Sequence, residues 1–224
     1  MNFVIGDSRV KCFKQGMFRN NITNVWTKPG SKLEHICGMI DKLTILHHDE
    51  QPLTSRNNFY ISSGICNLTD RLLERESQYQ EVVFNQKPDH YYENIASQMQ
   101  SISRHATSQY GRAIFCTIYP MSFRVWNKTL LNTNKTIVLR QQQHYEAMQR
   151  DLELAVEKVN DIIINANIEN GVTTPLFHYN MLHNRGKSVK KQKYNMLIDG
   201  CHPNNQLQYK CKRSLQKAIE NNSQ

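Results

Sequence analysis

The residues with the clearest chemical potential stand near the two ends of this 224-residue chain. Ser8 closes the run Phe-Val-Ile-Gly-Asp-Ser, a short apolar stretch that ends in a small, polar turn. Asp199 and His202 lie three residues apart in the run Asp-Gly-Cys-His-Pro-Asn. A serine nucleophile requires an imidazole base within hydrogen-bond reach and a carboxylate that orients the imidazole. The chain contains all three groups, so these residue types predict nucleophilic catalysis by Ser8.

Strand patterns alternate with helix patterns along the chain, which predicts an α/β fold with a parallel sheet covered by helices. Strands are expected at 2–5, 22–26, 59–62, 113–118 and 175–179. Helices are expected at 8–17, 33–43, 88–106, 148–166 and 207–219. The segment 121–137 is expected to be irregular. Sites in such sheets form beyond the carboxyl ends of the strands, and Ser8 directly follows the first expected strand.

The bulk composition is typical of a soluble globular protein, with 39% hydrophobic and 21% charged residues. The length suits a single domain, residues 1–224, with a full α/β core. No apolar run approaches the roughly 18–20 residues of a membrane span, and the first residues show no secretory signal pattern. We therefore expect a cytoplasmic protein without a membrane span.

A net charge of +9 favours polyanionic partners. The basic residues of one segment have no acidic residue among them: Arg185, Lys187, Lys190, Lys191 and Lys193. The segment runs into Asp199, so it is expected beside the mouth of the site. It is either a solvated loop or a docking patch for an anionic substrate or nucleic acid.

The run His47-His48-Asp49-Glu50 contains metal-capable residue types. Adjacent histidines point in different directions, however, and no further residue with ligand spacing follows nearby. We interpret the run as a solvated helix end, and we expect neither a metal nor a cofactor.

The two terminal motifs together resemble those of the GDSL, or SGNH, hydrolase family, and the resemblance would cover essentially the whole chain. GDS closes the first expected strand, and DGCHPN opens the last expected helix. The resemblance implies a three-layer, flavodoxin-like fold with a mostly parallel, five-stranded sheet between helices. It also implies that Ser8, Asp199 and His202 form a catalytic triad.

The family builds its oxyanion hole from the nucleophile's N–H, a glycine after the second strand and the asparagine of a GxND motif. Gly30 fits the glycine. Aligned on Gly64 without a gap, Cys66 takes the asparagine position, and a shift of one residue would bring Asn67 there instead. A thiol donates hydrogen bonds poorly beside an amide. Either Asn67 reaches the hole, or backbone donors suffice, or the activity is weak or absent.

These observations predict a hydrolase that acts on a small-molecule or acylated ester substrate. The alternative is a catalytically degenerate SGNH-fold binding module that uses its basic surface, for example for nucleic acid or another polyanion. Cys66 at the expected asparagine position motivates this alternative.

Overall fold

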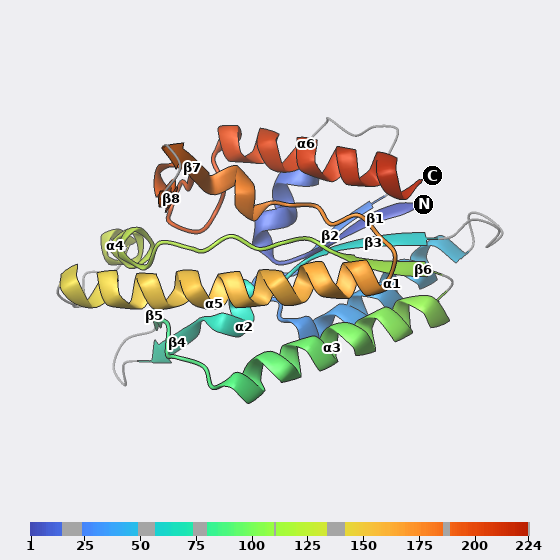
Figure 1. The fold of residues 1–224 in the computed structure, drawn as a ribbon, viewed down its shortest axis with the longest axis horizontal. Coiled ribbons are helices and arrows are strands. Elements are labelled where there is room, and N and C mark those ends of the chain that lie inside the picture. Colours follow the sequence, from blue (N-terminus) through green and yellow to red (C-terminus); the bar gives the residue numbers. More distant parts are fainter. Residues whose placement is uncertain are drawn as a thin grey trace.

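The computed structural model describes residues 1–14, 24–48, 57–73, 80–109, 111–133, 142–185 and 189–223. Within these ranges, the central sheet has four parallel strands in the order β2-β1-β3-β6 (Figure 1). Their bounds are Asn2–Gly6 for β1, Asn24–Thr27 for β2, Asn57–Ser62 for β3 and Gly111–Phe115 for β6. In the registers of the three pairs, Phe3 lies opposite Asn24 and Phe59, and Phe59 lies opposite Ala113.

Helices cover both faces of the sheet, as the sequence predicted (Figure 1). One face packs against α1 (Ile36–His48), α3 (Asp89–Ser108) and α5 (Gln142–Glu169). The other packs against α6 (Asn205–Asn222) and two short 3-10 helices, η1 (Ser8–Lys14) and η3 (His178–Met181). Among the described helices, none is long and apolar enough to cross a membrane.

Alternating side chains of the strands supply these two cores. Phe3 and Phe59 stack with ring centroids 5.4 Å apart on the face covered by α1, α3 and α5. Val4 and Tyr60, one position along in each strand, belong to the core under α6. Successive residues of a strand point to opposite faces, so a strand with both faces covered must be apolar on each. This is why the strand signals were continuous apolar runs.

The prediction of five sheet strands was wrong by one. The expected last strand, 175–179, adds no ladder: the Pro175 carbonyl accepts from Thr117 N at 3.1 Å, and η3 begins at His178. Proline has no N–H to donate and is poorly suited to a continuous ladder.

Asparagines of α5 occupy the outer edge of β6 instead of a fifth strand. Asn167 Oδ1 accepts from Phe115 N at 2.9 Å, and its Nδ2 donates to Phe115 O at 2.7 Å. Asn160 binds both backbone groups of Ile118 in the same way, at 2.8 and 2.9 Å. A carboxamide offers one acceptor and two donors, so it can satisfy a peptide edge as another strand would.

The expectation of irregular structure at 121–137 was also wrong, because Phe123–Thr133 forms helix α4. Residues 134–137 lie outside the described part. Ser122 Oγ accepts from Val125 N at 3.4 Å, and Gln149 of α5 accepts from Phe123 N at 3.2 Å. An N-cap and a tertiary contact thus provide acceptors for two N–H groups in the first turn of α4, although the segment has weak helix propensity.

The remaining elements are short and lie at the ends of the sheet. They are η2 (Leu33–His35), α2 (Ile65–Leu68), the hairpin of β4 (Asp70–Leu73) and β5 (Gln80–Val83), the hairpin of β7 (Leu182–Arg185) and β8 (Val189–Gln192), and η4 (Tyr194–Met196). Both hairpins are antiparallel.

Candidate active site

Ser8 begins η1 directly after the central strand β1, and a buried ion pair flanks it. The guanidinium of Arg9 binds both carboxylate oxygens of Asp7, and the Arg9 N–H also donates to Asp7 Oδ1 at 2.9 Å. Arg9 Nη1 reaches Tyr119 O at 3.0 Å. Burial opposes the charge of Arg9, but Asp7 raises its pKa above the ordinary value. The residues on both sides of Ser8 are therefore fixed.

Asp199 and His202 lie on a tight loop that ends just before α6. Gly200 has φ +87°, and a Cβ there would stand 2.6 Å from Trp126 N and 2.7 Å from Ser122 O. Only glycine adopts this conformation readily and tolerates so close a neighbour. The Ser122 N–H donates to Gly200 O at 2.7 Å, so the start of α4 holds the loop.

The fold brings the three predicted groups into one hydrogen-bonded chain. His202 Nε2 lies 2.8 Å from Ser8 Oγ, and His202 Nδ1 lies 2.6 Å from Asp199 Oδ2. Asp199 Oδ1 accepts the N–H groups of Cys201 and His202 at 2.9 and 2.8 Å. Burial tends to raise the pKa of Asp199, but these bonds outweigh it and lower the pKa to about 2. Such a chain can deprotonate a serine hydroxyl during attack on a carbonyl.

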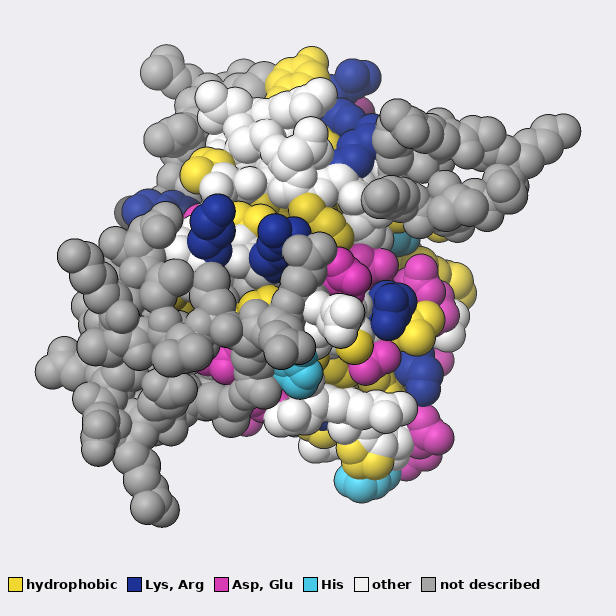
Figure 2. All heavy atoms as spheres, turned by 90° about the vertical axis from the view of Figure 1, so that its left-hand side faces the viewer, with side chains coloured by type: hydrophobic (Ala, Val, Ile, Leu, Met, Phe, Trp, Pro, Cys, Tyr) yellow, Lys and Arg dark blue, Asp and Glu magenta, His cyan; other side chains and the backbone are white. Residues whose placement is uncertain are grey.

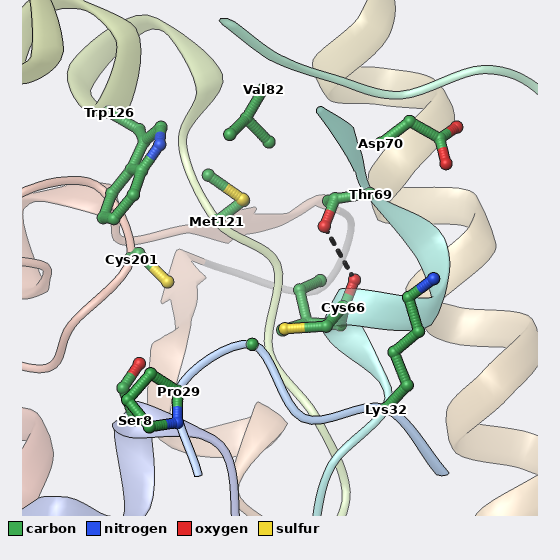
Figure 3. Close-up of a pocket in the computed structure, with 12 residues that line it drawn as sticks. Ser8, Pro29, Lys32, Cys66, Thr69, Asp70, Val82, Met121, Trp126 and Cys201 are labelled. Atoms are coloured by element: carbon green, nitrogen blue, oxygen red, sulfur yellow. Dashed lines mark hydrogen bonds between the residues drawn. The ribbon is translucent and has the colours of Figure 1, made fainter. Parts of the chain in front are cut away.

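A cavity of about 460 Å³ opens at Ser8 (Figure 3). Much of its wall is apolar or sulfur-bearing, with contributions from Ile65, Cys66, Val82, Met121, Trp126 and Cys201. In Figure 3 the sulfur atoms of Cys66 and Cys201 point toward one another across the cavity. Burial raises the pKa of the Cys201 thiol to about 12, so this thiol is neutral at neutral pH.

Solved structures with this architecture include a GDSL-like lipase from Bacteroides thetaiotaomicron, at a TM-score of 0.59 and 13% identity, covering 98% of this chain and 87% of that one. Another is a member of the lipolytic G-D-S-L family from Veillonella parvula, at a TM-score of 0.58 and 10% identity, covering 98% and 97%. The chain has the fold of the GDSL, or SGNH, hydrolases. No protein-family model and no curated protein matches the sequence.

Gly30, Cys66 and Asn67, the residues that the sequence predicts for an oxyanion hole, differ in whether they line the cavity. Gly30 and Cys66 both line the cavity with Ser8. Asn67 is buried, and its Oδ1 accepts from Leu33 N at 3.1 Å, which ties α2 to η2. Asn67 does not line the cavity. Of the two candidates Cys66 and Asn67, Cys66 is therefore the one that lines the cavity.

Sequence reasoning missed the contribution of α4 to the site. The Trp126 ring lies 6.0 Å from the His202 ring, with 50° between their planes, and Met121 lines the cavity. Ser122 was the available signal, because a serine before an apolar residue is a typical N-cap.

The predicted basic segment lies in and after the β7–β8 hairpin. Arg185 ends β7, Lys190 and Lys191 belong to β8, and Lys187 lies outside the described residues. The half-buried Lys193 follows, and its N–H donates to Met181 O at 2.8 Å. The hairpin leads through η4 into the loop of Asp199.

The metal-capable run begins where α1 ends. His47 and His48 are the last residues of α1, and Asp49 and Glu50 lie outside the described part of the chain. In the ranges that the structure describes, no group of three or more His, Cys, Asp or Glu residues could hold a metal ion.

Proposed function

We propose that the protein hydrolyses carboxylic esters with Ser8 as nucleophile, His202 as general base and Asp199 as the group that orients the imidazole. The hydrogen-bonded chain from Ser8 through His202 to Asp199 is the observation that supports this proposal most strongly. The likeness in fold to lipolytic proteins supports it independently.

The reaction follows from the protonation states of the chain. With a pKa of about 2, Asp199 is ionised at neutral pH, so His202 Nδ1 carries the proton of their bond and Nε2 accepts from Ser8. Ser8 Oγ attacks the ester carbonyl while Nε2 takes its proton. The imidazolium then protonates the leaving alkoxide, and an acyl-Ser8 ester forms. Water, deprotonated by His202, cleaves this ester, and the carboxylic acid and Ser8 are released.

The oxyanion would be bound by the N–H groups of Ser8 and Gly30 together with the Cys66 thiol. Cys66 lines the cavity, whereas the Asn67 carboxamide oxygen is engaged by Leu33. A thiol is a weak donor, and loss of one oxyanion donor typically costs on the order of 10²–10³ in rate. We therefore expect a slow hydrolase. Ile65, Val82 and Met121 suit an apolar acyl group in the cavity.

A fluorophosphonate probe with a fluorescent tag tests the proposal directly, because it phosphonylates only an activated serine. We expect one label per chain on wild-type protein, no label on Ser8→Ala, and loss of p-nitrophenyl ester hydrolysis in that variant. The melting temperature should be nearly unchanged, because Ser8 is half-buried and its hydroxyl is required for chemistry rather than packing. Equal labelling of folded wild type and Ser8→Ala would refute Ser8 as the nucleophile.

The weak donor at Cys66 also favours a second candidate, a degenerate SGNH-fold binding module. A folded wild-type protein that neither reacts with the probe nor hydrolyses any ester would support this candidate. Labelling at Ser8 with measurable turnover would exclude it.

A further inference from the structure

A second hollow, of about 710 Å³, lies between η3 and α6 and shares no lining residue with the cavity at Ser8. Tyr179 and Asn180 contribute from η3, and Lys210, Arg213 and Lys217 contribute from α6. Asn180 Nδ2 donates to Ser214 Oγ at 3.1 Å, so the two elements are joined along the hollow. We call this feature the η3–α6 groove.

The α6 side of the groove is positively charged. Lys210, Arg213 and Lys217 follow the spacing i, i+3, i+7, which places them on one stripe of the helix. None of the ion pairs within the described residues includes any of these three cations. Glu220 also lines the groove, but its carboxylate accepts from Gln216 Nε2 at 3.0 Å. The groove thus offers three cations to one carboxylate, which favours an anionic ligand.

Aromatic rings accompany these cations. Tyr179 lines the groove and is 50% exposed, and Tyr209, which precedes Lys210 and lies outside the lining, is 48% exposed. The His178 ring lies 3.9 Å from the Tyr179 ring, and the Arg213 guanidinium lies 5.9 Å from the Tyr209 ring centroid. Exposed rings beside a cationic groove can stack unpaired bases while the cations bind the backbone. In a duplex the base faces are stacked on one another, so a duplex could bind only through its phosphates to the cations.

The surroundings extend the positive potential. In Figure 2, some Lys and Arg side chains lie near the top of the face, at the height of α6 in Figure 1, and others lie at mid-height and below, whereas most Asp and Glu side chains drawn there lie in the lower half. The β7–β8 hairpin directly follows η3. We propose that the η3–α6 groove binds single-stranded nucleic acid, with phosphates on Lys210, Arg213 and Lys217 and bases stacked on Tyr179 and Tyr209.

The test uses a fluorescein-labelled single-stranded oligonucleotide of about twelve nucleotides, a length within the usual site sizes. Fluorescence anisotropy gives Kd for the full chain between about 50 and 200 mM NaCl. The triple variant Lys210→Gln, Arg213→Gln, Lys217→Gln should raise Kd at least about tenfold. It should also lower the slope of log K against log[salt] by about 2, since each single-strand phosphate contact contributes about 0.7.

The matched control removes three exposed cations from the opposite face of the sheet and leaves the groove unchanged. Its substitutions are Lys42→Gln, Arg104→Gln and Arg150→Gln. It changes the net charge by the same amount, so Kd should change by less than about twofold if the groove, and not bulk charge, binds the strand. Tyr179→Leu should weaken binding about fivefold or more, because a base loses its stacking partner, with an unchanged salt slope.

Three results would overturn the assignment. The first is an equal loss of affinity in the two triple variants. The second is no binding by wild type at the lowest salt. The third is wild-type binding of duplex DNA or heparin as tight as that of the single strand, without an effect of Tyr179→Leu. The melting temperature checks that every variant is folded. Ester hydrolysis by the groove variant should equal that of wild type, so failure of this inference is distinguishable from failure of the proposed hydrolysis.

Discussion

Cys66 lines the cavity at Ser8, at the position where the resemblance to the SGNH family implies an asparagine. Its thiol faces the cavity, while the Asn67 oxygen beside it holds Leu33 N. Of these two neighbouring side chains, Cys66 thus lines the pocket and Asn67 joins α2 to η2.

Substitutions at these two positions should have different effects. Cys66→Asn should raise kcat for a p-nitrophenyl ester about tenfold or more, because an amide donates a stronger hydrogen bond to the oxyanion than a thiol. Asn67→Ala should lower the free energy of unfolding by about 1–3 kcal/mol, because it leaves the buried Leu33 N–H without its partner. Steady-state kinetics and urea unfolding measure the two effects. A hundredfold fall in kcat for Asn67→Ala, with Cys66→Asn unchanged, would identify Asn67 as the donor.

Asp199 couples the site to the acid stability of the protein. Its pKa falls from 3.8 to about 2 on folding, so the unfolded chain binds more protons than the folded chain between these values. The stabilisation is complete above the unfolded pKa and is lost as the pH falls through the folded pKa. Between pH values of about 4 and 2, wild type should therefore lose more unfolding free energy than Asp199→Asn. Urea unfolding at a series of pH values tests this, and identical pH profiles would contradict it.

At the scale of elements, polar side chains replace backbone pairing where the sheet ends. Asn160 and Asn167 of α5 bind the backbone of Ile118 and Phe115, and Asn127 of α4 binds both backbone groups of Val82 in β5. These bonds hold the strand edge and the β4–β5 hairpin, from which Val82 reaches the cavity. The helices thus position the walls of the site as well as covering the sheet.

The contact at the edge of β6 can be tested with two nearby asparagines, Asn167 in α5 and Asn170 directly after the end of α5. Asn167→Ala should lower the unfolding free energy by about 2–4 kcal/mol, because the buried N–H and C=O of Phe115 both lose their partner. Asn170→Ala is the control, since Asn170 is exposed and its side-chain Nδ2 donates to the Ser103 hydroxyl at 3.0 Å rather than to a buried peptide group. It should change the unfolding free energy by less than about 0.5 kcal/mol. Urea unfolding measures both, and equal effects would show that the backbone pairing contributes little.

At the scale of the whole molecule, the two faces of the sheet have separate surroundings. The core under α1, α3 and α5 is distinct from the core under α6, and the η3–α6 groove belongs to the second. The cavity at Ser8 takes its lining from the strand ends and their connections instead. The proposed hydrolytic site and the proposed nucleic-acid groove therefore share no lining side chain.

The sequence by itself determined the fold class, the order of the main elements and the identity of the groups that can react. Apolar runs at 2–5, 59–62 and 113–118 coincide with β1, β3 and β6 because strands covered on both faces must be apolar throughout. The residue types of Ser8, Asp199 and His202 limit the chemistry before any geometry is known. Strand hydrophobicity and residue type are properties of short segments, so they can be read from the sequence without knowledge of the tertiary contacts.

The tertiary structure decided what depends on contacts between distant residues. Asn167 and Asn160 replace a fifth strand, and Ser122 with Gln149 allows α4 to form in a segment of weak propensity. Cys66 rather than Asn67 lines the cavity, and the Asn67 oxygen accepts a hydrogen bond from Leu33 N, a residue distant in the sequence. Apart from the Ser122 cap, which lies three residues from Val125, these hydrogen bonds join residues more than 20 positions apart. A hydrogen bond of that range leaves no periodic signal in the sequence.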